Sequence, residues 1–371
     1  MHRYIALPAT ILMLTACSTE EDGNIYADEG GQQTSITVGD SDPGDDSDGG
    51  EANDDVGEES EDEGGVKLDL GEDTGNMTAG DDGGDGNGCK KVDFLFVIDN
   101  SGSMAEEQDN LAASFPAFMN SIESTLDEAQ DFHIMVIDVD AWVYAGCETL
   151  CLLFPNLPGV CEGYVCGETQ PEQCEDVLGA GVTSPKGANA SNTDCNFSSG
   201  KRFIDATEPS LVSAFQCAAR VGTDSTNDPE RPMEAMVAAV SDSGAVATCN
   251  YDFLRDDAIL VVTFITDEND DAEDGSAGTV ESWRQALITA KNGDESAVVV
   301  LGLFGDGDLP DAICGSLDNG GAEQAPRLRQ FVDSWDTRGF FGSICAPDYD
   351  AFFQEAVEII DTTCDEFTPP K

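Results

Sequence analysis

Residues 92–104 read Val-Asp-Phe-Leu-Phe-Val-Ile-Asp-Asn-Ser-Gly-Ser-Met. Within them, the apolar run 94–98 is rich in β-branched and aromatic residues and has polar residues on both sides, which predicts a short buried strand. The run stops at Asp99, and apolar residues at helical spacing follow from about Glu106. The stretch therefore predicts a strand, a tight polar loop and a helix in direct succession.

The polar loop of this stretch carries side chains suited to a metal site. Asp99, Ser101 and Ser103 supply one carboxylate and two hydroxyls, the hard oxygen ligands that Mg²⁺, Mn²⁺ and Ca²⁺ prefer. Asp-x-Ser-x-Ser by itself is a weak signal, since polar turns of this length are common. Its place between a hydrophobic strand and a helix makes the prediction much stronger.

The remainder of the folded region alternates strands and helices. We expect strands at 132–138, 258–266, 297–304 and 339–344, and helices at 106–126, 211–221, from about 232, 279–291, 327–335 and 349–361. This alternation predicts an α/β fold, an open and mainly parallel doubly wound sheet with helices on both faces. Ligands of such sheets bind outside the carboxyl ends of the strands, where Asp99 and Asp267 both fall.

The stretch 92–104 resembles the opening of a von Willebrand factor A (vWA) domain, a family in which Asp-x-Ser-x-Ser begins the metal-ion-dependent adhesion site. The resemblance covers about residues 89–364. It implies a sheet with a short antiparallel edge strand, for which 201–204 is the candidate. It also implies that a threonine and a second aspartate from two later loops complete the site.

Both further ligands have candidates in this chain. Thr223 is our choice for the threonine, and Thr226 in the same polar loop remains a second candidate. The loop could also cap the following helix without touching a metal. Asp267 follows the most hydrophobic strand and matches the second aspartate, although Glu268 stands where the family has glycine.

The resemblance implies an adhesion mechanism. Asp99 and Asp267 would supply charge, directly or through water, while Ser101, Ser103 and Thr223 would supply oxygen geometry. Two carboxylates and three hydroxyls leave positions for water on the cation, for which Mg²⁺ is the first choice and Mn²⁺ or Ca²⁺ are alternatives. An Asp or Glu side chain of a protein ligand would replace one such water.

Residues 1–17 have the pattern of an export signal. A basic start precedes an apolar stretch of about ten residues, which is too short to span a membrane. The ending Leu-Thr-Ala-Cys at 14–17 resembles a bacterial lipobox, which implies cleavage before Cys17 and lipidation of its thiol. Ser18 would then permit sorting to the outer membrane of a Gram-negative cell. The alternative is an ordinary cleaved signal that leaves Cys17 free.

Residues 18–88 are acidic and hold scarcely a hydrophobic cluster. About two dozen acidic residues stand against the single Lys67, so the segment cannot bury enough apolar surface to offset the entropy of ordering. We predict an extended, disordered tether, with a loosely calcium-loading arm as the alternative. The formal charge of −59 for the whole chain argues against nucleic acid as a partner and leaves the lipid anchor as the expected contact with a membrane.

The chain has 13 cysteines, and setting Cys17 aside leaves an even number, which favours disulfides in an exported protein. A zinc site is the alternative for the Gly- and Pro-rich insertion 141–200, but no histidine lies within it. That insertion holds Cys147, Cys151, Cys161, Cys166, Cys174 and Cys195. Outside it, the predicted pairs are Cys89–Cys364, Cys217–Cys249 and Cys314–Cys345, and residues 365–371 form a tail.

The sequence lacks the side chains of a recognisable enzyme. His133 is the only histidine of the mature chain, and we expect it to be a hydrogen-bonded strand residue. No HExxH motif and no phosphate-binding loop occurs. Alternate residues of the run 267–273 resemble a calcium loop, but Ala272 stands where glycine is needed, so we interpret the run as solvated with a weak option for a second calcium.

These features together predict a lipid-anchored cell-envelope protein that captures a protein ligand through a bound divalent cation. The alternative is a structural or assembly protein of the envelope whose metal only stabilises the fold. The two hypotheses differ in whether chelation releases the partner or merely lowers the melting temperature.

Overall fold

The computed structural model describes residues 89–125, 131–139, 173–223, 230–272, 275–315 and 321–370, all within a compact unit formed by residues 79–371. The predicted signal, Cys17 and the tether lie outside the described residues. Among the residues that are described, no helix is both long and apolar enough to cross a membrane.

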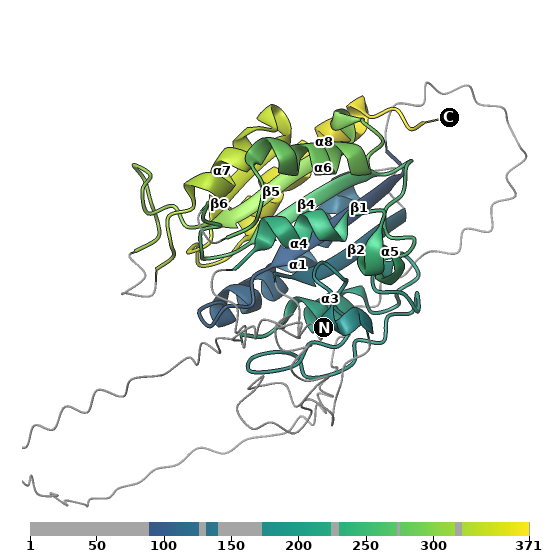
Figure 1. Ribbon diagram of the computed structural model, residues 1–371, viewed down its shortest axis with the longest axis horizontal. Coiled ribbons are helices and arrows are strands. Elements are labelled where there is room, and N and C mark those ends of the chain that lie inside the picture. Colours follow the sequence, from purple (N-terminus) through teal and green to yellow (C-terminus); the bar gives the residue numbers. More distant parts are fainter. Residues whose placement is uncertain are drawn as a thin grey trace, which may run out of the picture. The chain divides into compact units, whose positions relative to one another are not determined.

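The unit is an α/β fold built on one six-stranded sheet with the order β3-β2-β1-β4-β5-β6 (Figure 1). All neighbouring strands are parallel except β3, which is antiparallel to β2 at one edge. The strands are β1 (Lys91–Ile98), β2 (Asp131–Asp138), β3 (Ile204–Asp205), β4 (Ile259–Ile265), β5 (Val298–Phe304) and β6 (Gly339–Ser343).

The central strands are buried on both faces, as their near-continuous apolar sequences predict. Every residue of β4 and β5 is buried. In β1, Phe94 and Phe96 contribute to the core under one face of the sheet, and Leu95 and Val97 contribute to the core under the other. Period-two alternation of the side chains explains this division.

Helices cover both faces of the sheet. One core includes residues of α1 (Ala105–Thr125), α3 (Leu211–Ala219) and α8 (Asp350–Glu366). The other includes residues of α4 (Pro232–Ala239), α6 (Val280–Ala290) and α7 (Pro326–Asp333). Figure 1 shows α4 and α6 in front of the sheet. Short elements complete the unit: the helix α5 (Gly244–Cys249) and 3-10 turns at Gln173–Asp176, Glu295–Ala297 and Asp336–Arg338.

The predicted elements agree with the observed ones apart from their ends and the helix α5, which was not predicted. The edge strand differs most, because only Ile204 and Asp205 pair with β2 instead of residues 201–204. Arg202 is turned away from the ladder: its Nε donates to Gly181 O at 2.7 Å and its Nη1 forms an ion pair with Glu175 at 2.8 Å.

The strand register brings the carboxyl ends of the central strands to one level. Ile98, the last residue of β1, lies opposite Ile265 of β4 and Asp138 of β2. The chain continues from β1 through α1 to β2, which lies on one side of β1 in the sheet, while β4 lies on the other side of β1. The β1–β4 boundary is therefore the switch point of the sheet, and residues that follow β1 and β4 meet there.

Two predicted disulfides are confirmed and one is wrong. Cys89–Cys364 and Cys314–Cys345 are formed, with Cα atoms 4.7 and 5.2 Å apart. The predicted Cys217–Cys249 pair does not exist: Cys217 bonds to Cys195 and Cys249 bonds to Cys174. Cys217 lies on α3, whereas Cys249 ends α5, which packs beside α4 in the other helical layer. Four predicted disulfide cysteines lie outside the described residues: Cys147, Cys151, Cys161 and Cys166.

Candidate metal centre

Asp99 is held rigidly at the carboxyl end of β1. Its backbone N–H donates to Ile265 O at 2.9 Å, which continues the β1–β4 ladder past the last strand residue. Its side chain is fully buried. The oxygen Oδ1 accepts a hydrogen bond from Ser101 N at 2.7 Å, and Oδ2 accepts one from the Thr266 hydroxyl at 2.6 Å. Both carboxylate oxygens are therefore oriented by the two loops that meet here.

Ser101, Ser103 and Asp267 lie together beside Asp99. The Oγ atoms of the two serines are 3.3 Å apart, and the Ser101 hydroxyl donates to Asp267 Oδ1 at 3.5 Å. Asp267 is buried and Ser103 is exposed, so the cluster reaches solvent on the serine side. The structure thus brings four of the five predicted ligands together from two loops that are far apart in sequence.

Thr223 lies in a third loop that Gln108 of α1 connects to Asp99. Gln108 Nε2 donates to Asp99 O at 3.0 Å and to Gly222 O at 2.8 Å, and Gln108 Oε1 accepts from Gly222 N at 3.2 Å. The Thr223 hydroxyl itself contacts Asn189 and Ala188, not Asp99 or Asp267. Thr226 lies outside the described residues. Sequence reasoning missed Gln108, which is buried. Its only local signal is that a polar residue stands on an otherwise apolar face of the helix.

Burial and mutual repulsion disfavour negative charge in this cluster. Burial, opposed by the Thr266 hydrogen bond and reinforced by the negative charge of Asp267, raises the pKa of Asp99 to about 7. Burial also raises the pKa of Asp267, where hydrogen bonds from Ser103 and Ser101 act in the opposite direction and the charge of Glu323 adds to the rise. Two acids with raised pKa values therefore face one another at the switch point.

These two carboxylates differ from other buried acids of the domain in their partners. Asp93 is paired with Arg255 at 2.7 Å, and Asp270 is paired with Arg327 at 3.3 Å. Among the described residues, no ion pair includes Asp99 or Asp267. A buried charge without a counterion is costly, and a bound cation would remove that cost.

The donor set fits a hard divalent cation. In the described part of the chain, no group of three or more cysteine, histidine, aspartate or glutamate side chains is arranged to hold a metal. The cluster at the switch point has two carboxylates and takes its remaining oxygens from hydroxyls. Carboxylate and hydroxyl oxygens with water suit Mg²⁺, Mn²⁺ or Ca²⁺ far better than zinc or copper.

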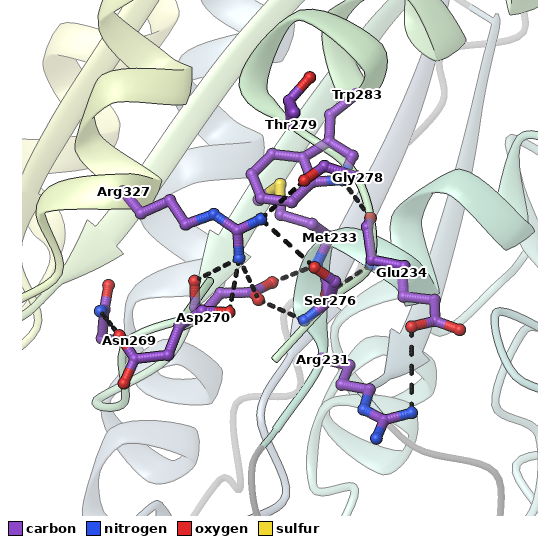
Figure 2. A network of polar contacts seen from close by, with 12 residues as sticks. Arg231, Met233, Glu234, Asn269, Asp270, Ser276, Gly278, Thr279, Trp283 and Arg327 are labelled. Carbon is purple, nitrogen blue, oxygen red and sulfur yellow. Dashed lines mark hydrogen bonds and ion pairs between the residues drawn. The ribbon is translucent and has the colours of Figure 1, made fainter. Parts of the chain in front are cut away.

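The loop that carries Asp267 is fixed by Asp270, which is fully buried (Figure 2). Asp270 Oδ1 accepts from Ser276 N at 2.6 Å, and its Oδ2 accepts from Met233 N at 3.1 Å at the start of α4. Ser276 Oγ in turn accepts from Glu234 N at 2.8 Å. The prediction that the whole run 267–273 is solvated is wrong at Asp270, because this carboxylate satisfies backbone donors of two separate segments.

Arg327 of α7 closes this network from the other side (Figure 2). Its Nη1 donates to Asp270 O at 2.8 Å and to Asp271 O at 2.6 Å, and its Nη2 donates to Gly278 O at 2.9 Å. The guanidinium lies 4.3 Å from the centre of the Trp283 ring. One arginine therefore binds carbonyls near both ends of the loop between β4 and α6, the loop that also carries Asp267.

His133 is a structural residue, as predicted. Its Nδ1 lies 2.8 Å from Phe253 O and 3.6 Å from Asp93 Oδ1, at the amino-terminal half of β2. Burial lowers the pKa of its imidazole. His133 lies before the carboxyl end of β2 and does not contribute to the metal cluster.

Comparison with known proteins adds no family to this description, since no family model matches the chain and no curated protein matches it. The fold and the site define the class by themselves: an α/β domain with a mixed, mostly parallel sheet and a two-carboxylate oxygen cluster at its switch point.

Proposed function

We propose that the folded unit is a vWA-like module that binds a protein ligand through a divalent cation, with Mg²⁺ as the first choice. The observation that carries the proposal is the meeting of Asp99 and Asp267 at the ends of neighbouring parallel strands, bridged by Ser101. Neither carboxylate has a cationic partner among the described residues, and both have raised pKa values. A metal ion would supply the missing positive charge.

The sheet supports the same proposal. Its order, 3-2-1-4-5-6, places β1 and β4 at the centre, and among the described strands the antiparallel one is the short edge strand β3. A short antiparallel edge strand is what the resemblance of residues 92–104 to a vWA domain implies. Four of the five predicted ligands, all except Thr223, follow β1 and β4, which is where open α/β sheets bind their ligands.

The proposed ligands would have two roles, which follow from their chemical type. Asp99 and Asp267 would supply charge, and Ser101, Ser103 and Thr223 would supply neutral oxygens. The cation would act as a Lewis acid that accepts one oxygen from the ligand. Exposure of Ser103 leaves the cluster open for an Asp or Glu side chain of the ligand. Because the charges of Glu107 and Glu323 also act near Asp267, basic residues beside that carboxylate would favour binding.

We also propose that the module is displayed from the cell envelope, most readily from an outer membrane. Lipid on Cys17 would anchor the mature chain, and residues 18–88 would act as the tether. The test is metabolic labelling with a fatty acid, followed by fractionation of membranes. Cys17→Ala is expected to lose both the label and the membrane association, and a labelled Cys17→Ala chain would contradict the anchor.

The test of metal-dependent capture is a pull-down from envelope extracts with the full mature chain, run with Mg²⁺ and then with EDTA. Asp99→Asn is expected to behave like EDTA treatment. Asp109→Asn is the control, because Asp109 is an exposed acid of α1 whose partner is the surface residue Arg220. If partners persist in EDTA while the melting temperature falls, the metal only stabilises the fold and the chain is a structural or assembly protein.

A further inference from the structure

The insertion that precedes β3 reaches the third loop of the candidate metal centre. Its end is fixed to α3 by the Cys195–Cys217 disulfide. Ser191 N donates to Arg220 O at 3.2 Å, just after α3 ends. Residues 186–192, the insertion loop, therefore lie against the segment that leads from α3 to Gly222 and Thr223.

The insertion loop is braced by its own side chains. Asn192 Nδ2 donates to Gly187 O at 2.8 Å and to Ala190 O at 3.0 Å, and Asn192 Oδ1 accepts from Gly187 N at 3.0 Å. Asn189 and Asn192 have φ values of 57° and 52°, a left-handed conformation that asparagine adopts more readily than most residues. The loop thus presents fixed groups to its neighbour.

Those groups are directed at Thr223. Ala188 O accepts from Thr223 N at 2.9 Å, and Asn189 Nδ2 donates to Thr223 Oγ1 at 2.8 Å. The Thr223 hydroxyl donates in turn to Ala188 O at 3.4 Å. Gly222 allows this approach, because a Cβ there would lie 3.0 Å from Ala190 Cβ and 3.1 Å from Ala188 O.

The hydrogen bonds of the Thr223 oxygen are compatible with a role as a metal ligand. A hydroxyl has one proton to donate and two lone pairs. The proton of Thr223 is directed to Ala188 O and one lone pair accepts from Asn189, so the hydrogen bonds to described residues leave the second lone pair for a cation. Outer-shell hydrogen bonds of this kind orient ligand atoms in metal sites.

We propose that Asn189, together with the carbonyl of Ala188, is a positioning residue that holds Thr223 as a ligand of the divalent cation. The inference rests on the proposed function, since it presupposes the metal centre at Asp99 and Asp267. It gives the insertion a role: an element that lies outside the parallel strands completes the metal centre, and the insertion loop forms one wall beside it.

The test is a titration of the full mature chain with Mn²⁺, followed by the paramagnetic signal of the free ion. The variants are Asn189→Gly, Thr223→Val and the double variant. Asn196→Gly is the matched control, because Asn196 has a φ of 49° in the same insertion and its side chain donates to Asp194 O, not to the third loop. Glycine accepts positive φ at both positions, so each change removes a side chain without straining the backbone.

Asn189→Gly is expected to weaken Mn²⁺ binding about tenfold, the lower end for loss of an outer-shell partner. Thr223→Val should weaken it at least as much, and the double variant should bind no more weakly than Thr223→Val. Asn196→Gly should leave the affinity unchanged. The metal-free melting temperatures of the two glycine variants should agree, because neither side chain is buried.

Three results would overturn the inference and leave the proposed function standing. One is an unchanged affinity in Asn189→Gly, and a second is full additivity of the two changes, because then Asn189 does not act through Thr223. A third is an unchanged affinity in Thr223→Val while Asp99→Asn abolishes binding, which removes Thr223 from the ligands but leaves the proposed function standing. Retained binding in Asp99→Asn would overturn both proposals.

Discussion

Asp99 and Asp267 lie at the ends of neighbouring parallel strands and are joined through Ser101, whose N–H donates to Asp99 at 2.7 Å and whose hydroxyl donates to Asp267 at 3.5 Å. Each carboxylate is buried, and the charge of Asp267 raises the pKa of Asp99 further. Such an arrangement lowers stability unless a cation is present. Carboxylates with perturbed pKa values are concentrated at the functional sites of proteins.

Asp99→Asn should abolish metal binding and stabilise the metal-free protein. The amide keeps the shape of the side chain, can still accept from Ser101 N, and removes a buried charge that repels Asp267, although its amino group cannot accept the hydrogen bond that Thr266 donates to Asp99. In EDTA at pH 8 we expect the free energy of unfolding to rise, because burial and the charge of Asp267 make the ionised carboxylate of Asp99 unfavourable in the folded state. Urea unfolding measures this change, and a Mn²⁺ titration should show no binding. A less stable variant in EDTA would show that the carboxylate is held favourably without metal.

The stability of the metal-free protein should fall as pH rises from about 4 to about 7. Burial raises the pKa of Asp93 to about 6 and that of Asp99 to about 7, from 3.8 in the unfolded chain. The folded state therefore holds these protons more tightly, and their contribution is complete below pH 4 and lost above the folded pKa values. His133, whose pKa is lowered by burial, acts in the opposite direction near pH 6 but is a single group.

Urea midpoints in EDTA between pH 4 and pH 8 measure this dependence. The acids with lowered pKa values, such as Asp257, lose their contribution only at lower pH and do not obscure it. Excess Mg²⁺ should reduce the fall, because the cation binds the ionised carboxylates. A midpoint that rises steadily from pH 4 to pH 7 in EDTA would contradict the raised pKa values.

Arg327→Lys should be strongly destabilising. A lysine has one ammonium group and cannot reach the carbonyls at both ends of the loop that Arg327 binds. Lysine keeps the positive charge, so the loss comes from the carbonyls left without a donor, each of which costs about 1–3 kcal/mol when buried. Arg231→Lys is the control, since its pair with Glu234 is 4.0 Å long and both side chains are well exposed. Equal melting temperatures for the two variants would show that the contacts of Arg327 do not stabilise the loop.

The same Arg327→Lys variant should bind Mn²⁺ more weakly, provided that the titration is run at a temperature where it remains folded. Asp267 is the third residue before Asp270, so movement of the loop that Arg327 binds would displace Asp267, a proposed metal ligand. Arg231→Lys should bind Mn²⁺ with unchanged affinity. A folded Arg327→Lys variant with full affinity would show that the loop keeps its position without the arginine.

The disulfide between the two ends of the domain should stabilise it more than the disulfide of the insertion. Cys89 and Cys364 are separated by 275 residues, whereas Cys195 and Cys217 are separated by 22. Loop-closure entropy predicts contributions of about 5 and about 3 kcal/mol respectively. Paired replacements by alanine, compared by thermal unfolding, should show the larger loss for Cys89/Cys364. The reverse order would mean that the insertion supports the native state in other ways.

Gly222→Ala should disturb the contact between the insertion loop and Thr223. Gly222 has a φ of 103°, and an added Cβ would press on Ala190 and on Ala188 O. Gly293→Ala measures the conformational cost alone, because Gly293 has a φ of 89° and nothing within 4 Å of its Cβ position. We expect Gly222→Ala to cost about 1–3 kcal/mol more than Gly293→Ala. Equal melting temperatures would show that the insertion loop yields without cost.

The fold class could be predicted from local sequence because its signals are local. A fully buried parallel strand such as β4 needs apolar side chains on both faces, so Ile259–Ile265 is recognisable without its neighbours. Asp99, Ser101 and Ser103 are close in the chain, so their oxygens share one loop in any structure that contains this strand and helix. Asp267 could be singled out because it directly follows the most hydrophobic strand, where the resemblance to a vWA domain implies a second aspartate.

The remaining features depend on contacts between residues that are distant in the chain. Pairing of Cys217 with Cys195 instead of Cys249 followed from which helical layer each cysteine joined. In the sequence Asp270 is one of several acids expected to be solvated, whereas in the fold it accepts from Met233 N of α4 and Ser276 N and pairs with Arg327 of α7. Asn189 and Thr223 are 34 residues apart, and Gln108 and Gly222 are 114 apart. Hydrogen bonds across such separations leave no periodic pattern in the sequence, so only the packed chain reveals them.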